Sequence, residues 1–161
     1  MRSFKIFLLI VAGTSFITVI GGAVYEHLAV VPKWKVAPPA SLSMFQGEYG
    51  LDPGDFWELI HPITMILLVG CLVANWKTKR RKFIAMVIAG YILMAIVTLT
   101  YFVPELLSII HTPYQAKVDK SLVSRAATWE KLSLLRLVFI VCLAYILLYS
   151  LTKDEDLKIY A

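Results

Sequence analysis

Glutamate and histidine pairs recur at the ends of the apolar segments of this chain. Glu26 and His27 close the first segment, and Glu58 and His61 open the second. Glu58 and His61 are three residues apart, so they share one face of a helix. Carboxylate and imidazole groups together bind transition metals. The pattern predicts one metal ion (zinc, iron or copper) held by some of Glu26 or His27, Glu58 and His61, with Glu105 as a further candidate ligand.

The Glu-x-x-His spacing is also the ligand pattern of di-iron carboxylate bundles. Such a site repeats the pattern on a second helix, but Ser133 stands where a histidine would follow Glu130. A symmetrical di-iron site is therefore not expected. Histidines on two different helices also leave haem ligation open as an alternative.

Arg136 lies inside an apolar run, where an unpaired cation would be expensive in hydrocarbon. We therefore expect it to face the interior of a bundle, where it pairs with Glu105 or Glu130 or binds an anionic or carbonyl-bearing ligand. Tyr101 lies one helical turn before Glu105 on the same stripe. The predicted catalytic residues are Glu105, Arg136 and Tyr101.

Several of these residues also have a purely structural interpretation. Asp55 and Glu58 have the spacing of a helix N-cap and its capping-box partner. His61 is equally compatible with a buried histidine whose hydrogen bonds are satisfied, and Glu105 with an ion pair to Arg136. His111 is expected in a loop.

The segments that must position these groups are long and apolar. The chain has 161 residues, of which 59% are hydrophobic, and this exceeds the usual share in soluble domains. Four runs approach the length needed to cross a bilayer as helices, at about residues 4–31, 56–76, 83–110 and 132–151. We predict a single domain spanning residues 1–161, an all-α integral membrane four-helix bundle in up-down-up-down order.

The orientation follows from basic residues. Five of the six positions from Lys77 to Lys82 are lysine or arginine, and this marks a cytoplasmic loop. Both termini are then cytoplasmic, in a bacterial plasma (inner) membrane, and loops 32–55 and 112–131 lie outside. The net charge of +5 thus reflects topology, and no nucleic-acid partner is expected.

The first outer loop is expected to be structured, with a short interfacial helix within residues 40–49. Aromatic residues near the same level predict an interfacial belt. These are Trp34, Tyr49, Phe56, Trp57, Tyr101, Tyr114 and Trp129.

The whole chain resembles the anthrone-oxygenase-like family of four-span membrane proteins. The resemblance rests on Gly21-Gly22 leading to Val31-Pro32, on the stretch from Phe56 to Pro62, and on Trp129 with Arg136. It implies a four-helix membrane fold and oxidation of a hydrophobic aromatic substrate without an organic cofactor.

Three classes of function follow. The first is a membrane oxidoreductase with a polar site in the outer leaflet, acting on a hydrophobic small molecule. The second is a binder or transporter of a metal, haem or small ligand at the same site. The third is an accessory subunit of a larger membrane complex or a homo-oligomer, in which buried charges set helix register. The lipid bilayer is a partner in all three.

Overall fold

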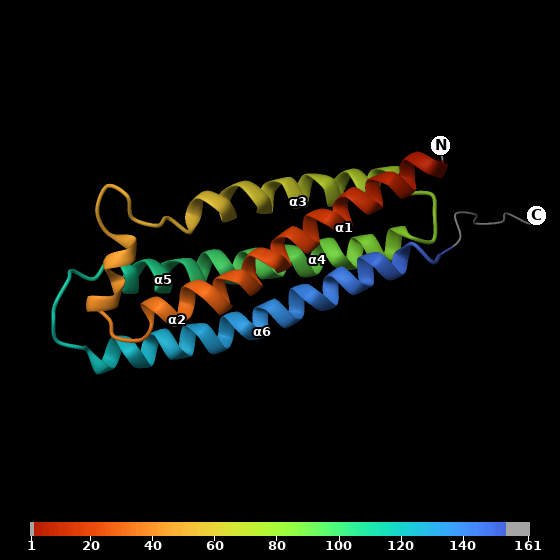
Figure 1. The fold of residues 1–161 in the computed structure, drawn as a ribbon. Coiled ribbons are helices and arrows are strands. Elements are labelled where there is room, and N and C mark those ends of the chain that lie inside the picture. Colours follow the sequence, from red (N-terminus) through yellow and green to blue (C-terminus); the bar gives the residue numbers. More distant parts are fainter. Residues whose placement is uncertain (1, 154–161) are drawn as a thin grey trace, which may run out of the picture.

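The computed structural model describes residues 2–153, and all regular secondary structure in that range is helical (Figure 1). Four long helices and one short one account for it. The long helices are, in order, α1 (Arg2–Tyr25) with the π-helix η1 (Glu26–Val30) and α2 (Val31–Trp34); α3 (Gly54–Ala74); α4 (Arg81–Val97) with the π-helix η3 (Thr98–Phe102) and α5 (Val103–Ile110); and α6 (Lys120–Ser150). The short one is the 3₁₀ helix η2 (Ala40–Phe45).

Each long helix is long and apolar enough to cross a membrane. The candidate spans are Ser3–Trp34, Gly54–Ala74, Arg81–Ile110 and Lys120–Ser150. The prediction of an all-helical fold with four long apolar helices is therefore confirmed.

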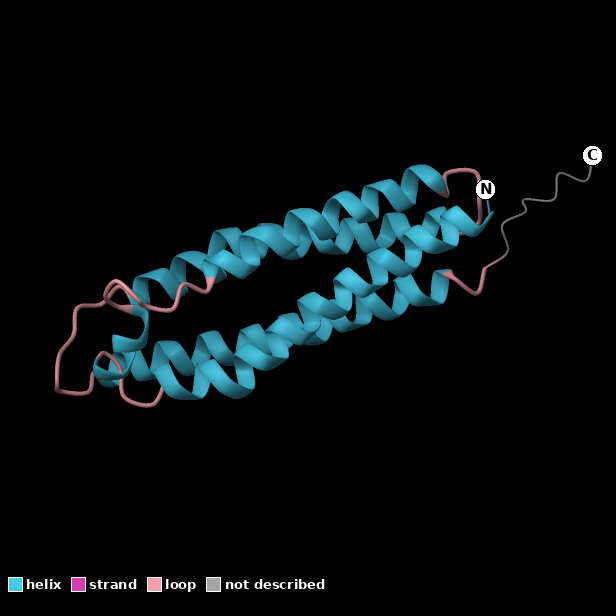
Figure 2. Cartoon of the chain, turned by 45° about the horizontal axis from the view of Figure 1, so that its top comes forward, coloured by secondary structure: helices cyan, strands magenta, loops and turns pink. Residues whose placement is uncertain are grey.

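The long helices form a closed ring of contacts. Helix α1 packs against α3 and α6, and α4 packs against the same two helices. The start of α1 and the end of α6 lie at one end of the molecule, and the loops after α2 and α5 lie at the other (Figures 1 and 2). We call the latter the loop end.

Glycines allow two of these helix pairs to approach closely. A Cβ at Gly22 of α1 would lie 2.5 Å from the Phe56 ring of α3, and one at Gly90 of α4 would lie 2.7 Å from the Leu143 side chain of α6. Small residues at helix crossings are the usual means of close packing between membrane helices. These contacts set the rotation of each helix, and so they decide which polar side chains face inward.

A second apolar core lies at the loop end, apart from the main core around Phe16 and Leu68. It is built from α2, η2, η3, α5 and α6. Its buried members are Val31, Trp34, Leu42, Phe102, Ile109, Ala126 and Trp129. The short helix expected within residues 40–49 is thus present as η2, which places Leu42 in this core.

The predicted aromatic belt is wrong for two of its members. Trp34 is 1% exposed and Trp129 is 2% exposed, so both are core residues. Their rings meet edge to face, with centroids 5.8 Å apart. Tyr49 and Tyr114, by contrast, are largely exposed. Because both types of aromatic residue occur near the ends of apolar runs, composition alone did not separate a belt from a core.

Helix α6 begins at Lys120, so the loop predicted over residues 112–131 is wrong for its second part. Asp119 is its N-cap, and the carboxylate accepts hydrogen bonds from the backbone N–H groups of Ser121 and Leu122. Leu122, Ala126 and Trp129 then follow at helical spacing and are buried. Residues 120–131 are therefore the first three turns of α6.

This cap should make stability depend on pH. Hydrogen bonds from the Ser121 hydroxyl and backbone N–H hold the pKa of Asp119 below its ordinary value. A carboxyl group with a lowered folded-state pKa stabilises the fold fully above its unfolded pKa, and that contribution is lost as pH falls through the folded pKa. The wild type should therefore lose stability relative to Asp119→Asn, which caps without titrating, as pH falls below about 4. Unfolding curves of both proteins across acid pH would check this, and a difference independent of pH would contradict it.

Candidate functional site

Two π-helical turns at the same level of the bundle share one sequence feature. Each spans five residues and is followed by Val-Pro, at Val31-Pro32 after η1 and at Val103-Pro104 after η3. The N–H of Val31 bonds to the carbonyl of Glu26, and that of Val103 to the carbonyl of Thr98. Proline lacks an N–H and crowds the preceding turn, so the chain relaxes by widening that turn. π-helical turns are frequent at functional sites.

Arg136 of α6 reaches the second of these turns. Its Nη1 donates to Thr98 Oγ1 at 3.2 Å, and its Nη2 donates to Ser133 Oγ at 3.1 Å. The guanidinium carbon lies 4.5 Å from the centre of the Phe102 ring, which is cation–π distance. The side chain is thus held in the bundle interior by two neutral hydroxyls and one ring.

Two further ionisable side chains lie near Arg136, Glu26 of η1 and His61 of α3. Neither forms an ion pair with it, because within residues 2–153 no carboxylate lies within 4.0 Å of the guanidinium nitrogens. All three side chains are half-buried. We call Glu26, His61, Thr98, Ser133 and Arg136 the Arg136 site; every long helix contributes to it.

His61 is linked to a buried tyrosine. His61 Nδ1 and the Tyr91 hydroxyl of α4 are 2.6 Å apart, and the Trp57 ring stacks on the imidazole with centroids 5.4 Å apart. Deeper in the bundle, the hydroxyls of Ser15 and Thr64 are 2.6 Å apart. A hydrogen-bonded histidine and tyrosine can exchange a proton.

His27 points to a different neighbour. Its Nδ1 lies 2.9 Å from the Ala23 carbonyl one turn earlier, and its ring lies parallel to the Trp129 indole with centroids 6.4 Å apart. Its Nε2 is buried without a hydrogen-bond partner among the described residues.

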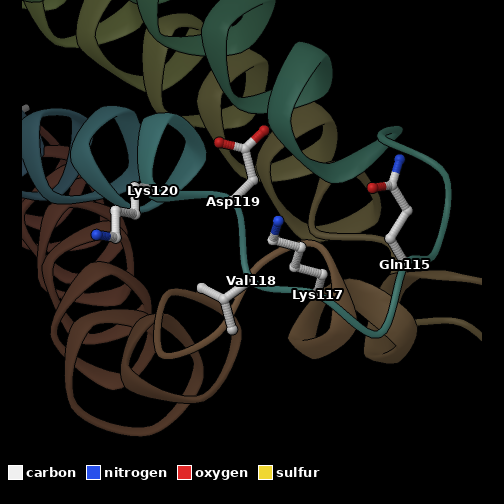
Figure 3. A pocket seen from close by; sticks show the side chains of 5 residues that line it. All are labelled: Gln115, Lys117, Val118, Asp119 and Lys120. Carbon is white, nitrogen blue, oxygen red and sulfur yellow. The ribbon is translucent and has the colours of Figure 1, made fainter.

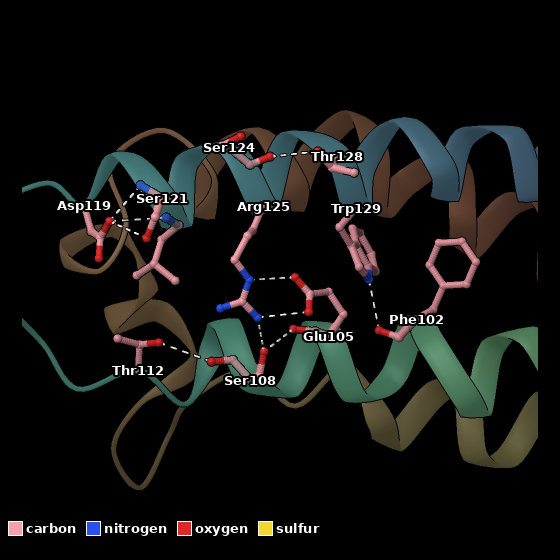
Figure 4. Close-up of polar contacts among 11 residues, drawn as sticks. Phe102, Glu105, Ser108, Thr112, Asp119, Ser121, Ser124, Arg125, Thr128 and Trp129 are labelled. Carbon is pink, nitrogen blue, oxygen red and sulfur yellow. Dashed lines mark hydrogen bonds and ion pairs between the residues drawn. The ribbon is translucent and has the colours of Figure 1, made fainter.

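Glu105 forms an ion pair with Arg125, a residue that was not predicted from the sequence. Arg125 of α6 donates to it in two bonds, Nε to Oε1 at 2.7 Å and Nη2 to Oε2 at 2.9 Å, and also contacts Ser108 (Figure 4). This pair joins α5 to α6 at the loop end. Arg125 lies in the segment taken for a loop; the N-cap at Asp119 and the helical spacing that follows it were the signals that could have revealed it.

The expectation that Arg136 reaches Glu105 or Glu130 is therefore wrong. Glu105 binds Arg125, and Glu130 binds Lys35. Because α6 is continuous, Arg136 lies eleven residues beyond Arg125, about 16 Å farther along the helix axis. The interior position of Arg136 was predicted correctly. Of the predicted catalytic set, Arg136 faces the interior, Glu105 lies in an ion pair, and Tyr101 is 37% exposed.

The predicted metal ligands are not gathered. Among the described residues, no three His, Cys, Asp or Glu side chains form a group that could hold a metal ion. Glu58 is exposed and turns back toward Gly54, while His27 and His61 are turned to Ala23 and Tyr91. Helix α3 begins at Gly54 with Pro53 as its N-cap and no side-chain cap, so the Asp55 cap considered above is wrong; Asp52 Oδ1 accepts from the Gly54 N–H at 2.7 Å. Metal binding stays a prediction without support from this geometry.

A pocket of about 270 Å³ lies elsewhere, at the start of α6. It is lined by Gln115, Lys117, Val118, Asp119 and Lys120. Figure 3 shows these side chains pointing in different directions, and Asp119 is engaged in capping the helix.

Comparisons of this chain with protein-family models, with curated proteins and with solved structures found no match. The resemblance to the anthrone-oxygenase-like family stays a prediction.

Proposed function

We propose that this chain is an integral membrane protein that binds an apolar molecule through a carbonyl or carboxylate oxygen at Arg136. The observation that carries the proposal is the set of partners of this arginine. A guanidinium has five N–H donors, and the described hydrogen bonds of Arg136 go to two neutral hydroxyls. A cation inside an apolar helix without an ion-pair partner is expensive, and an acceptor from a ligand would offset that cost.

The position of Arg136 limits the kind of ligand. It lies near the middle of α6, in a helix apolar enough to span a membrane, and its neighbours include the Phe102 ring. Because the side chain is half-buried, a molecule dissolved in the bilayer can reach it between helices. Glu26 and His61 stand near enough to respond to the charge of the bound group. An amphiphile with one oxygen-bearing head group fits these constraints best.

Binding can be measured with probes that share an alkyl chain. Tritiated laurate and methyl laurate present a carboxylate and an ester carbonyl, and dodecane presents neither. With the protein in lipid nanodiscs, we expect saturable binding of the first two above empty nanodiscs. Arg136→Gln should weaken both by about tenfold or more, because a hydrogen bond to a charged group contributes about 1.5–3 kcal/mol.

Arg125→Gln is the matched control, since it removes an arginine of the same helix that is engaged with Glu105. It should leave probe binding unchanged. Equal affinities of the wild type and Arg136→Gln, or no saturable binding of either oxygen-bearing probe, would overturn the proposal.

The proposal includes the orientation of the bundle. The helices cross in up-down-up-down order, the loop end faces outward, and the basic loop from Lys77 to Lys82 faces the cytoplasm of a bacterial cell. A cysteine introduced at Lys79 should resist an impermeant thiol reagent in intact cells and react after the cells are opened. Labelling in intact cells would reverse the orientation.

The expected oxidoreductase activity stays a prediction. The His61–Tyr91 pair is the feature that favours it, because oxidation or reduction of an organic carbonyl requires proton transfer. Assembly into a homo-oligomer or a larger complex also stays a prediction.

A further inference from the structure

One ring nitrogen of His27, Nδ1, is hydrogen-bonded, and the other, Nε2, is buried without a hydrogen-bond partner among the described residues. A carbonyl oxygen can only accept, so the contact at 2.9 Å to the Ala23 carbonyl requires a proton on Nδ1. In a neutral imidazole Nε2 is then an acceptor, and it has no partner among the described residues although His27 is only 8% exposed. Buried polar atoms are nearly always hydrogen-bonded in native proteins. This atom therefore calls for a donor that is not part of the described chain.

The direction of this atom follows from the ring. Nδ1 faces the backbone of the helix that carries His27, so Nε2, on the far edge of the ring, points away from that helix. The ring faces Trp129 of α6 in a parallel stack. Nε2 therefore points along the plane of its own ring, beside the Trp129 indole.

Arg136 lies seven residues, or about two turns, beyond Trp129 on the same helix. Arg136 donates to Ser133, one turn earlier, so its guanidinium reaches back toward the level of Trp129. Ser133 and Trp129 are four residues apart, or about 6 Å along the helix axis. The Phe102 ring lies beside both groups, 4.5 Å from the guanidinium carbon and 6.1 Å, centroid to centroid, from the Trp129 ring. Phe102 thus contacts the guanidinium on one side and Trp129 on the other, and His27 packs against the same Trp129 ring.

We infer that His27 Nε2 accepts a hydrogen bond from a hydroxyl of the ligand whose carbonyl oxygen binds Arg136. The ligand class is an acyl lipid that carries a free hydroxyl near its ester or acid carbonyl, as monoacylglycerols and hydroxylated fatty acids do. The inference rests on the proposed function and narrows it. A carbonyl alone would satisfy Arg136 but leave Nε2 unpaired, since an acceptor cannot bond to another acceptor.

Matched probes test the hydroxyl requirement. Monolauroyl glycerol has the ester carbonyl and free hydroxyls, and its dimethyl ether keeps the carbonyl and loses the donors. In nanodiscs, the wild type should bind the first about fivefold more tightly, the factor expected from one net hydrogen bond. His27→Phe keeps a ring against Trp129, and there the two probes should bind equally. His111→Phe, which changes an exposed histidine, should keep the wild-type preference.

A second measurement does not depend on the variant folding. The chain has three histidines, so nitrogen NMR of histidine-labelled protein can be assigned with single substitutions. The Nε2 resonance of His27 should move toward its hydrogen-bonded position when monolauroyl glycerol is added, and should not move with the dimethyl ether.

The outcomes separate the two proposals. Equal wild-type affinity for the two glycerol probes, with both still weakened by Arg136→Gln, would overturn the role of His27 and leave the proposed function standing. Binding that ignores Arg136 would overturn both. If the Nε2 resonance of His27 already has its hydrogen-bonded position without probe, the atom has another partner and the inference is overturned. The same holds if the wild type contains a stoichiometric metal or shows a Soret band that is lost in His27→Phe.

Discussion

Replacing Trp129 with alanine is expected to lower the free energy of unfolding by about 4 kcal/mol, the typical loss for a large aromatic residue in a packed core. Trp129 is 2% exposed, and its ring faces those of His27, Trp34 and Phe102. Its indole N–H donates to the Phe102 carbonyl at 3.0 Å. The substitution therefore opens a cavity between α6 and three other segments and removes one hydrogen bond to the Phe102 carbonyl. Reversible unfolding in mixed micelles of mild detergent and dodecyl sulfate would measure the loss.

Two further variants sharpen this prediction. Trp76→Ala removes a tryptophan that is 57% exposed, and should change stability by about 0.5 kcal/mol or less. Trp129→Phe keeps most of the packing and removes the N–H donor, so it should cost about 1 kcal/mol. If Trp129→Ala were no more destabilising than Trp76→Ala, the second core at the loop end would be wrong.

Replacing Arg136 with leucine is expected to lower the free energy of unfolding by about 2 kcal/mol, because the Thr98 and Ser133 hydroxyls lose their donor and a hydrogen bond from a charged group contributes about 1.5–3 kcal/mol. The leucine fits the apolar surroundings, but Glu26 loses a nearby cation. Adding Glu26→Gln removes the carboxylate whose nearby cation is gone, so the double variant should recover part of the lost free energy of unfolding.

A double-mutant cycle measures this coupling directly. Glu26→Gln should be destabilising or neutral alone and stabilising in the Arg136→Leu background. An equal effect in both backgrounds would mean that the charges do not interact. Arg125→Leu is the control, because its partner Glu105 is partly exposed, and loss of such a pair costs about 1 kcal/mol or less.

The two π-helical turns, η1 and η3, carry the residues that surround Arg136 and Trp129 of α6. In η1 the widened turn carries Glu26 and His27, and in η3 it carries Thr98 and Phe102. All four residues lie near Arg136 or Trp129 of α6. The Val-Pro pairs that follow are plain in the sequence, but the turn they widen, and the residues they rotate, depend on how the helix settles against its neighbours.

The sequence by itself determined the helical class, the four apolar segments and the gathering of ionisable residues at one end of them. These properties depend on composition along one dimension, since about twenty apolar residues make a helix of membrane length whatever its neighbours are. The sequence also predicted that Arg136 faces the interior of the bundle, because the energetic penalty of a cation on an apolar helix face does not depend on its partner.

Only the tertiary structure decided which partner each charge takes. Glu105 pairs with Arg125 and Glu130 with Lys35, while Arg136 is left with two hydroxyls and a ring. Each residue along a helix turns its side chain by about 100°, so a small change in rotation or one widened turn exchanges partners entirely. That rotation is set by contacts between residues far apart in sequence, such as Gly22 with Phe56 and Gly90 with Leu143. The pairing of charges is therefore a property of packing, and no periodicity within a single segment contains it.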